Sequence, residues 1–161
     1  MASCSHFLLF LLLLSHTHAL VPEFRKATSE DVLVARKFLF KEAMNPLSLS
    51  TRTLLVAHDV NQGILGFGQI RPLDDKYSEL ASIYVLPQYR RQGVGSALVQ
   101  ELLERHDADD DAKICLLTLK PTISFYESHG FASLRSPEDL PPTVQFEFKA
   151  GSFISSIYMV P

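Results

Sequence analysis

The sequence is poor in residues that lock a small domain covalently or through a metal. It has two cysteines, and Cys4 lies in an N-terminal segment that we expect to be removed, so the mature chain would form no internal disulfide. Cys115 lies in the apolar run KICLLTL, which indicates a buried and unreactive thiol. No cluster of His, Cys and Asp has ligand spacing, so we expect no metal.

A basic segment is also missing. The formal net charge is −3, and residues 1–20 carry no Asp, Glu, Lys or Arg, so removing them leaves the charge unchanged. A mildly acidic chain without a basic tail is a poor candidate for general nucleic-acid binding. Hydrophobic residues make up 47% of the chain and charged residues 20%, which is typical of a globular domain.

One apolar block stands apart at the N-terminus. Residues 7–14 read FLLFLLLL and are followed by SHTHA, an order that resembles a secretory signal cleaved after Ala19. The block is too short to span a membrane, which takes roughly 20 apolar residues. The first six residues contain no Lys or Arg, so an organellar signal, or a cytoplasmic protein with a wrongly assigned start, stays an alternative. We therefore expect a signal or targeting segment at residues 1–20 and a single domain at residues 21–161.

From residue 21 onward, strand and helix patterns alternate. The acidic stretch 107–111 is expected to be a solvated loop, and the tail over 141–160 forms either a strand pair or a short helix and a final strand near 157–160. The pattern predicts strands at 23–28, 79–86, 113–119 and 131–134, a β-hairpin at 53–71, and helices at 30–40, 93–106 and 122–129.

The turn between the strand at 79–86 and the helix at 93–106 carries unusual chemistry. Arg90, Gly93 and Gly95 fit the pattern Arg/Gln-x-x-Gly-x-Gly/Ala at a helix N-terminus. Glycines bare the backbone, and the first helical turn offers unpaired N–H donors to an anion. Arg90 and Arg91 can add charge-assisted contacts. A P-loop lysine and the third glycine of a dinucleotide fingerprint are both missing. These residues alone indicate either an anion site or a helix cap decorated by solvated arginines.

Together with two other stretches, this turn resembles the GNAT superfamily of acetyl-CoA-dependent N-acetyltransferases. FRKATSEDV (24–32) is similar to that family's first strand and helix start. SELASIYVLPQYRRQGVGSALV (78–99) is similar to its cofactor-binding motif, and SFYESHGF (124–131) to its second cofactor-side motif. The resemblance implies an α/β (α+β mixed) fold: a mostly antiparallel mixed sheet of six to seven strands, flanked by about four helices and splayed at the cofactor-binding strand.

The resemblance also implies an activity: transfer of an acetyl group from acetyl-CoA to a small amine, a polyamine or a peptide amine, by direct attack in a ternary complex. A catalytically inactive acyl-CoA-binding module, or an interaction domain with a coincidental loop, are the alternatives. In such enzymes the loop amides hold the pyrophosphate, and the pantetheine pairs with the splayed strand. Carried over to this sequence, the residues that line the cofactor, largely through backbone groups, are Leu86, Arg90, Arg91, Gln92, Gly93, Val94, Gly95 and Ser96.

Glu79 is the candidate general base. Strand alternation places it on the face of Ala81, Ile83 and Val85, so it would project from an apolar surface. A partly desolvated cleft raises the pKa of a carboxylate, which suits a base that acts on an ammonium group. The resemblance implies the same role, often through a water molecule. The alternative is a solvated glutamate at a strand end.

Tyr126 is the candidate general acid. The resemblance implies that it lies near the cofactor sulfur and protonates the departing thiolate. The ordinary phenol pKa of about 10 lies near that of a thiol. The alternative is a packing residue whose hydroxyl is hydrogen-bonded at the rim of the cleft.

Two positions depart from the family pattern. Leu119 and Thr122 stand where members often carry Asn and a small Ala, which removes a polar contact to the pantetheine arm. The acceptor is expected to meet residues 41–52, the turn at 71–78 and the C-terminal tail. Acidic residues on that side favour a cationic amine; they are Asp74, Asp75 and Glu79.

Overall fold

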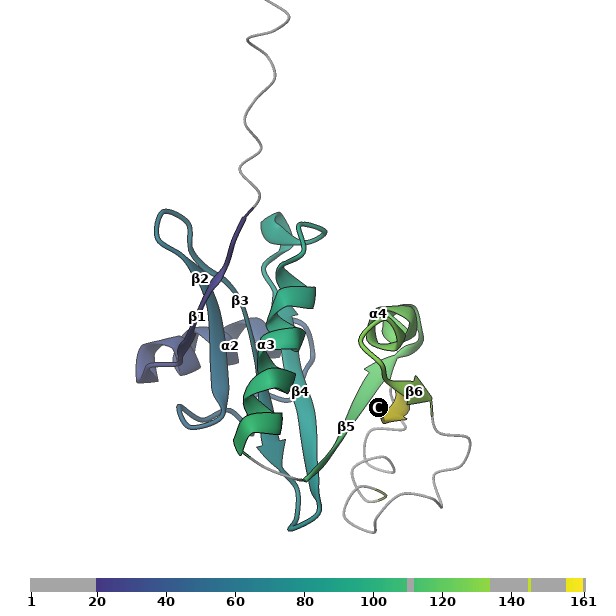
Figure 1. The fold of residues 1–161 in the computed structure, drawn as a ribbon. Helices are drawn as coiled ribbons and strands as arrows, with labels where there is room; N and C mark the ends of the chain where they lie inside the picture. Colours follow the sequence, from purple (N-terminus) through teal and green to yellow (C-terminus); the bar gives the residue numbers. More distant parts are fainter. Residues whose placement is uncertain (1–19, 110–111, 134–144, 146–155, 161) are drawn as a thin grey trace, which may run out of the picture.

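In the computed structural model, which describes residues 20–109, 112–133, 145 and 156–160, one seven-stranded mixed sheet carries helices on both faces (Figure 1). The strand order is β1-β2-β3-β4-β5-β7-β6. The strands are β1 (Glu23–Lys26), β2 (Leu54–Asp59), β3 (Gly63–Pro72), β4 (Tyr77–Val85), β5 (Lys113–Leu119), β6 (Ala132–Ser133) and β7 (Ser156–Val160). The helices are α2 (Ser29–Lys41), α3 (Val94–Asp109) and α4 (Ile123–Glu127), with the short 3₁₀ turns η1 (Pro87–Tyr89) and η2 (Lys120–Thr122).

The sheet opens between β4 and β5. Neighbouring strands from β1 to β4 are antiparallel, as are β5, β7 and β6, whereas β4 and β5 run parallel. The parallel pairing joins only residues 77–79 to residues 113–115, and beyond Glu79 the two strands diverge (Figure 1). The expected splay at the cofactor-binding strand is therefore present.

Two apolar cores fill the space between the helices and the sheet. Figure 1 shows α3 in front of the sheet and α2 behind it. Side chains alternate along β2, so Leu54 and Val56 pack toward α2 while Leu55 and Ala57 pack toward α3. The α3 core takes Leu65, Leu80, Val94, Leu98, Val99 and Leu102, and the α2 core takes Val32, Ala35, Leu39, Phe67 and Tyr84. Each fully buried side chain of this size contributes about 1.5–3 kcal/mol.

Helix α2 begins at a complete capping box. The backbone N–H of Asp31 donates to the Thr28 hydroxyl over 3.2 Å, and the Thr28 N–H donates to an Asp31 carboxylate oxygen over 2.7 Å. Arg25 of β1 donates to both Asp31 oxygens over 2.6 and 3.1 Å. Hydrogen bonding from the Arg25 guanidinium, and then from Thr28, lowers the pKa of Asp31 to about 2.

Replacing Asp31 with asparagine should destabilise the fold by about 1–2 kcal/mol at neutral pH, a value reduced for the exposure of Arg25. The pKa of Asp31 is lower in the folded state, so its contribution is present above the unfolded pKa of about 4 and is lost as the pH falls toward 2. Denaturant unfolding at neutral pH and near pH 2 measures this. If wild type stayed more stable than Asp31→Asn by the same free energy of unfolding at neutral pH and near pH 2, the lowered pKa of Asp31 would be contradicted.

A β-bulge in β4 resets the alternation of its side chains. Phe67 pairs with Tyr84 and Gln69 pairs with Ala81, so β4 holds one more residue than β3 between these pairs. Ser82 lies in the bulge with a φ of 57°. Ile83 and Val85 consequently pack on the α3 core, whereas Glu79 and Ala81 face the α2 side. The predicted common face of Glu79, Ile83 and Val85 is wrong because the bulge inserts an extra residue between them.

The remaining boundaries lie close to the sequence predictions. Helix α3 continues through Asp109, so the first part of the predicted acidic loop is helical. The final strand expected near 157–160 is β7, while the alternatives for most of 141–155 concern positions outside the described residues, as does the leader at 1–19. Among the residues that the structure describes, no helix combines the length and hydropathy needed to cross a membrane.

Candidate active site

The loop between β4 and α3 presents backbone donors. Gly93 has a φ of 82° and Arg91 a φ of 60°, so the chain makes two left-handed steps before the helix. The first helical hydrogen bond runs from the Ala97 N–H to the Gly93 carbonyl over 3.0 Å. The N–H groups of residues 94–96 precede this bond, as at any helix N-terminus, and such groups can donate to an anion without breaking the helix. The Val94 side chain is buried in the core, so only its backbone faces the loop.

Arg90 folds back onto the protein. Its Nε donates to the Val85 carbonyl over 2.9 Å, and its guanidinium lies 5.5 Å from the centre of the Tyr84 ring. Nη2 is 3.9 Å from the Glu42 carboxylate at the end of α2. In this structure, therefore, Arg90 fastens the loop to the end of β4, although its side chain stays 49% exposed. Arg91 is exposed, and the Gln92 side chain donates to the Gln88 carbonyl over 2.8 Å.

The two glycines of the motif serve different needs. A Cβ on Gly93 would meet no atom within 4 Å, so glycine is required there by the positive φ and not by space. A Cβ on Gly95 would lie 3.5 Å from Val85 and 3.6 Å from the Phe125 ring, which are ordinary contacts. Gly95 thus marks the place where the end of β4, the start of α3 and α4 meet, and an alanine fits there.

Gly66 in β3 is expected to tolerate alanine far less well than Gly95 does. A Cβ on Gly66 would lie 2.6 Å from the Tyr84 carbonyl oxygen, a backbone atom that cannot move without shifting β4. We expect Gly66→Ala to reduce the free energy of unfolding by about 1–3 kcal/mol. Gly95→Ala is the matched control and should change it little. Denaturant unfolding of both variants checks this, and equal stability of the two would contradict the packing of β3 on β4.

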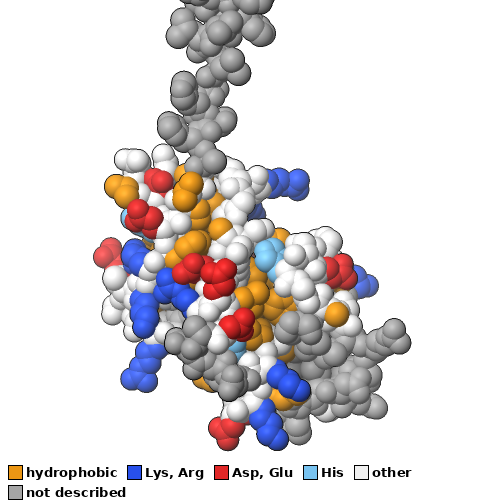
Figure 2. Space-filling model, viewed as in Figure 1, with side chains coloured by type: hydrophobic (Ala, Val, Ile, Leu, Met, Phe, Trp, Pro, Cys, Tyr) orange, Lys and Arg blue, Asp and Glu red, His pale blue; other side chains and the backbone are white. Residues whose placement is uncertain are grey.

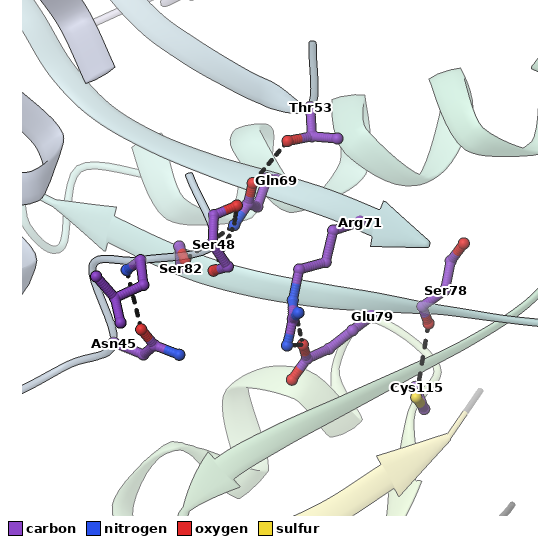
Figure 3. Close-up of polar contacts among 10 residues, drawn as sticks. Asn45, Ser48, Thr53, Gln69, Arg71, Ser78, Glu79, Ser82 and Cys115 are labelled. Carbon is purple, nitrogen blue, oxygen red and sulfur yellow. Dashed lines mark hydrogen bonds and ion pairs between the residues drawn. The ribbon is translucent and has the colours of Figure 1, made fainter. Parts of the chain in front are cut away.

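Glu79 is buried and paired. Its side chain lies opposite Arg71 of β3, whose Nε and Nη2 lie 2.7 and 2.5 Å from Glu79 Oε2 (Figure 3). Only 6% of the Glu79 surface is exposed, so it is not the solvated strand-end glutamate of the alternative interpretation. Glu79 is also the last β4 residue paired with β5, opposite Cys115. The carboxylate therefore belongs to the residue at which the splay begins.

Tyr126 lies in α4, which follows β5. Its ring packs edge-on against Phe125 and Phe131, with ring centres 5.0 and 6.2 Å apart. Burial raises the pKa of the Tyr126 phenol to about 12. Within the part of the chain that the structure describes, its hydroxyl has no hydrogen-bond partner, unlike the rim hydrogen bond of the alternative interpretation. Because Phe125 contacts the Gly95 position, Tyr126 belongs to the helix that borders the loop between β4 and α3.

Further residues of β5 and of the region around α4 have structural roles. Cys115 is fully buried, and its thiol lies 3.5 Å from the Ser78 carbonyl. His129 Nδ1 is 2.8 Å from the Phe125 carbonyl near the end of α4. The Thr122 hydroxyl donates to the Leu119 carbonyl over 2.9 Å, while the Leu119 side chain is half exposed. Thr122 therefore supports the turn into α4.

Gln69 and Arg71 were not singled out by sequence reasoning. Both lie on β3 and, two residues apart, face the α2 side where Glu79 lies. The sequence did contain a signal for these two residues. The run GQIRP places two polar side chains on the same face of β3, a strand in which the residues before Gln69 are buried. In Figure 2, hydrophobic side chains are exposed in a band between the part of the molecule with α3 and the part with α4.

The structure combines a mixed sheet that is splayed between β4 and β5 with the N-terminus of α3 beside the opening. The profile of the Acetyltransferase (GNAT) domain matches residues 50–133. The chain belongs to this family of acetyltransferases, and the predicted fold is confirmed.

Solved structures share the fold at low sequence identity. Rv2747 from Mycobacterium tuberculosis in complex with CoA has a TM-score of 0.72 and 20% identity over 86% of this chain and 98% of that chain. N-acetylglutamate synthase from Neisseria gonorrhoeae, complexed with coenzyme A and N-acetyl-glutamate, has a TM-score of 0.72 and 16% identity over 88% of this chain and 35% of that one. This chain therefore spans about a third of the Neisseria protein. Phosphinothricin acetyltransferase from Sinorhizobium meliloti, in complex with AcCoA, has a TM-score of 0.65 and 16% identity over 88% of both chains.

Proposed function

We propose that this protein is an N-acetyltransferase that transfers the acetyl group of acetyl-CoA to a primary amine in a ternary complex. The observation that carries the proposal is the N-terminus of α3, which lies beside the opening between β4 and β5. Gly93, which has a positive φ and no side chain, leaves the backbone there exposed. The family match and the structural neighbours with CoA or AcCoA support it.

The cofactor would bind mainly through the backbone. The N–H groups of Gly93, Val94, Gly95 and Ser96 would hold the pyrophosphate, because they lie at a helix N-terminus. The exposed Arg91 and Gln92 would flank it, and Arg90 would keep the loop attached to β4. The pantetheine would pair with the edge of β4, from Leu80 to Leu86, that β5 leaves unpaired.

The proton leaves the acceptor through Glu79. Arg71 stabilises the ionised carboxylate, in contrast to the desolvated and more basic carboxylate that the sequence predicted, so Glu79 can accept a proton but as a weaker base. Since Glu79 is buried, a water molecule would relay the proton from the ammonium. The free amine then attacks the thioester carbonyl, and a backbone N–H at the β4 bulge polarises its oxygen. The new C–N bond forms as the C–S bond breaks.

Tyr126 would protonate the leaving thiolate. Its pKa of about 12 keeps the phenol protonated at neutral pH, so the proton is always present. A thiol has a pKa of about 8.5, so full transfer is uphill in the free protein, and the phenol acts first as a hydrogen-bond donor to sulfur. The amine loses a second proton as the amide forms, and this proton restores the phenol through solvent, so one proton is released overall.

The acceptor side is less acidic than the sequence indicated. Glu79 is neutralised by Arg71, and Asp74 Oδ1 accepts the N–H groups of Lys76 and Tyr77 over 2.9 Å each within its turn. This geometry gives no preference for a polycation. We therefore propose a small primary amine as acceptor, amino acids included, in keeping with the acetylated amino acid bound by the Neisseria neighbour.

The leader is a separate proposal. We propose that residues 1–19 form a signal removed after Ala19, on the strength of the apolar block and the small residues that follow it. N-terminal sequencing of the mature protein decides: a start at Leu20 supports it, and an intact Met1 or Ala2 refutes it.

Coenzyme A release tests the activity. Purified protein is mixed with acetyl-CoA and with amino acids, small amines, a polyamine or a peptide, and free thiol is measured over time. Release that depends on an amine supports the proposal. A thermal shift with acetyl-CoA but no turnover on any amine would identify an acyl-CoA-binding module instead. The absence of any shift at saturating acetyl-CoA would remove the cofactor assignment itself.

A further inference from the structure

Gln69 is a fully buried polar side chain on the apolar α2 face of the sheet. None of its surface is exposed, and Phe67 precedes it on the same face. Burying an amide without partners costs about 1–3 kcal/mol in proteins, whereas an apolar side chain would avoid that penalty. The Gln69 amide therefore depends on the hydrogen bonds that it makes inside the protein.

Its hydrogen bonds join three segments. The Gln69 carbonyl oxygen accepts from the Thr53 hydroxyl over 2.8 Å. Its Nε2 lies 3.4 Å from the Ser48 carbonyl, 3.3 Å from the Ser48 hydroxyl and 3.3 Å from the Ser82 hydroxyl (Figure 3). Ser48 and Thr53 belong to the segment between α2 and β2, and Ser82 belongs to the β4 bulge. One side chain thus ties the segment expected to meet the acceptor to the strand expected to hold the thioester.

The bulge needs such support. Ser82 has a φ of 57°, which a non-glycine residue adopts only when its surroundings hold it there. On the α3 side, a Cβ on Gly68 would overlap Ile83 Cδ1 and lie 3.2 Å from Leu102 Cδ1, so the bulge packs tightly against β3 and α3. On the α2 side, the Gln69 amide holds Ser82. The bulge is therefore fixed from both faces.

We propose that Gln69 is a positioning residue for catalysis. It holds the Ser82 bulge, three residues beyond Glu79, and the segment with Ser48 in one geometry, so that the backbone donor, the carboxylate and the acceptor are aligned. The proposal rests on the proposed acetyl transfer. Gln69 contacts neither the base nor the pyrophosphate loop in the structure; it acts through Ser82 and Ser48.

The first test separates rate from cofactor binding. Gln69→Met keeps the approximate size of the side chain and removes every hydrogen bond of the amide. We expect kcat to fall roughly 10- to 100-fold, since a misplacement of about 1 Å can lower a rate 100-fold. The dissociation constant of acetyl-CoA should change less than about twofold, because the loop amides at α3 lie outside this network. Wild-type kcat, or an equal loss in both quantities, would overturn the proposal.

A matched variant separates positioning from general destabilisation. Val56→Ala removes a buried side chain from the same sheet face, outside the network, and should lower stability with little change in kcat. Ser82→Ala removes the bulge end of the network, and its effect on kcat should not add to that of Gln69→Met, because both act on the same contact. Additive effects, or a kcat loss for Val56→Ala as large as that for Gln69→Met, would refute positioning through Ser82.

A readout without turnover keeps the proposal independent of the acceptor. Amide hydrogen exchange in free Gln69→Met protein should speed up in residues 80–85 and in residues 44–53 together, and not in β1. Unchanged exchange in either segment would refute the linkage. If wild-type protein releases no coenzyme A with any amine, the proposed function fails, while the exchange experiment still decides whether Gln69 couples the two segments.

Discussion

Glu79→Gln is expected to lower kcat by about 10²–10⁴-fold, the usual contribution of a positioned general base, and to leave acetyl-CoA binding nearly unchanged. The amide matches the carboxylate in shape but cannot take a proton from an ammonium group. The affinity for acetyl-CoA is kept because the loop at Gly93 is formed by other residues. The time course of coenzyme A release gives kcat, and a binding isotherm gives the dissociation constant of acetyl-CoA.

The ion pair complicates this substitution in a defined way. Glu79→Gln leaves the Arg71 guanidinium facing a neutral amide, and removal of one partner of a buried pair is destabilising. The double variant Glu79→Gln with Arg71→Gln replaces the ion pair by two uncharged amides. It should recover stability without recovering turnover. Glu30→Gln, an exposed change in the first turn of α2 and outside the segments expected to meet the acceptor, should keep wild-type turnover. Turnover within twofold of wild type for folded Glu79→Gln would remove Glu79 from the mechanism.

Tyr126→Phe is expected to lower kcat by about 10- to 100-fold while the fold stays intact. The phenyl ring keeps its edge-on packing against Phe125 and Phe131, and within the described residues no partner of the hydroxyl is left unpaired. The loss should be largest for acceptors whose attack is fast, because departure of the thiolate then limits the rate. Wild-type kcat for folded Tyr126→Phe would remove Tyr126 from the mechanism.

The same variant carries a prediction on stability at high pH. The pKa of Tyr126 is raised to about 12 in the folded state by burial, against about 10 when unfolded. A raised pKa means that the contribution to stability is complete below pH 10 and is lost as the pH rises toward 12. The difference in the free energy of unfolding between wild type and Tyr126→Phe, measured by denaturant unfolding, should therefore fall between pH 10 and pH 12. A difference that stayed flat would contradict the burial of the phenol.

Much of the fold was predictable because its signals are local. Thr28 and Asp31 mark the start of α2 within four residues, and the turn NQG marks the hairpin of β2 and β3. Gly93 was recognised from the motif, and its positive φ shows why another residue is strained there. Tyr126 was singled out by the resemblance of SFYESHGF to the family's second cofactor-side motif, and Gly130 ends that helical segment with a φ of 88°.

The sequence by itself determined the order of the elements, because capping, turn and periodicity signals act between residues close in the chain. The resemblance of its motifs indicated the family, which the domain match then showed. Tertiary structure decided what Glu79 faces. The bulge at Ser82 turned Ile83 and Val85 to the other side of the sheet, and the register of β3 on β4 brought Arg71 to the carboxylate. Pairing between strands chose these contacts, and a strand pattern alone does not specify which residue of a neighbouring strand lies opposite or where a bulge shifts the register.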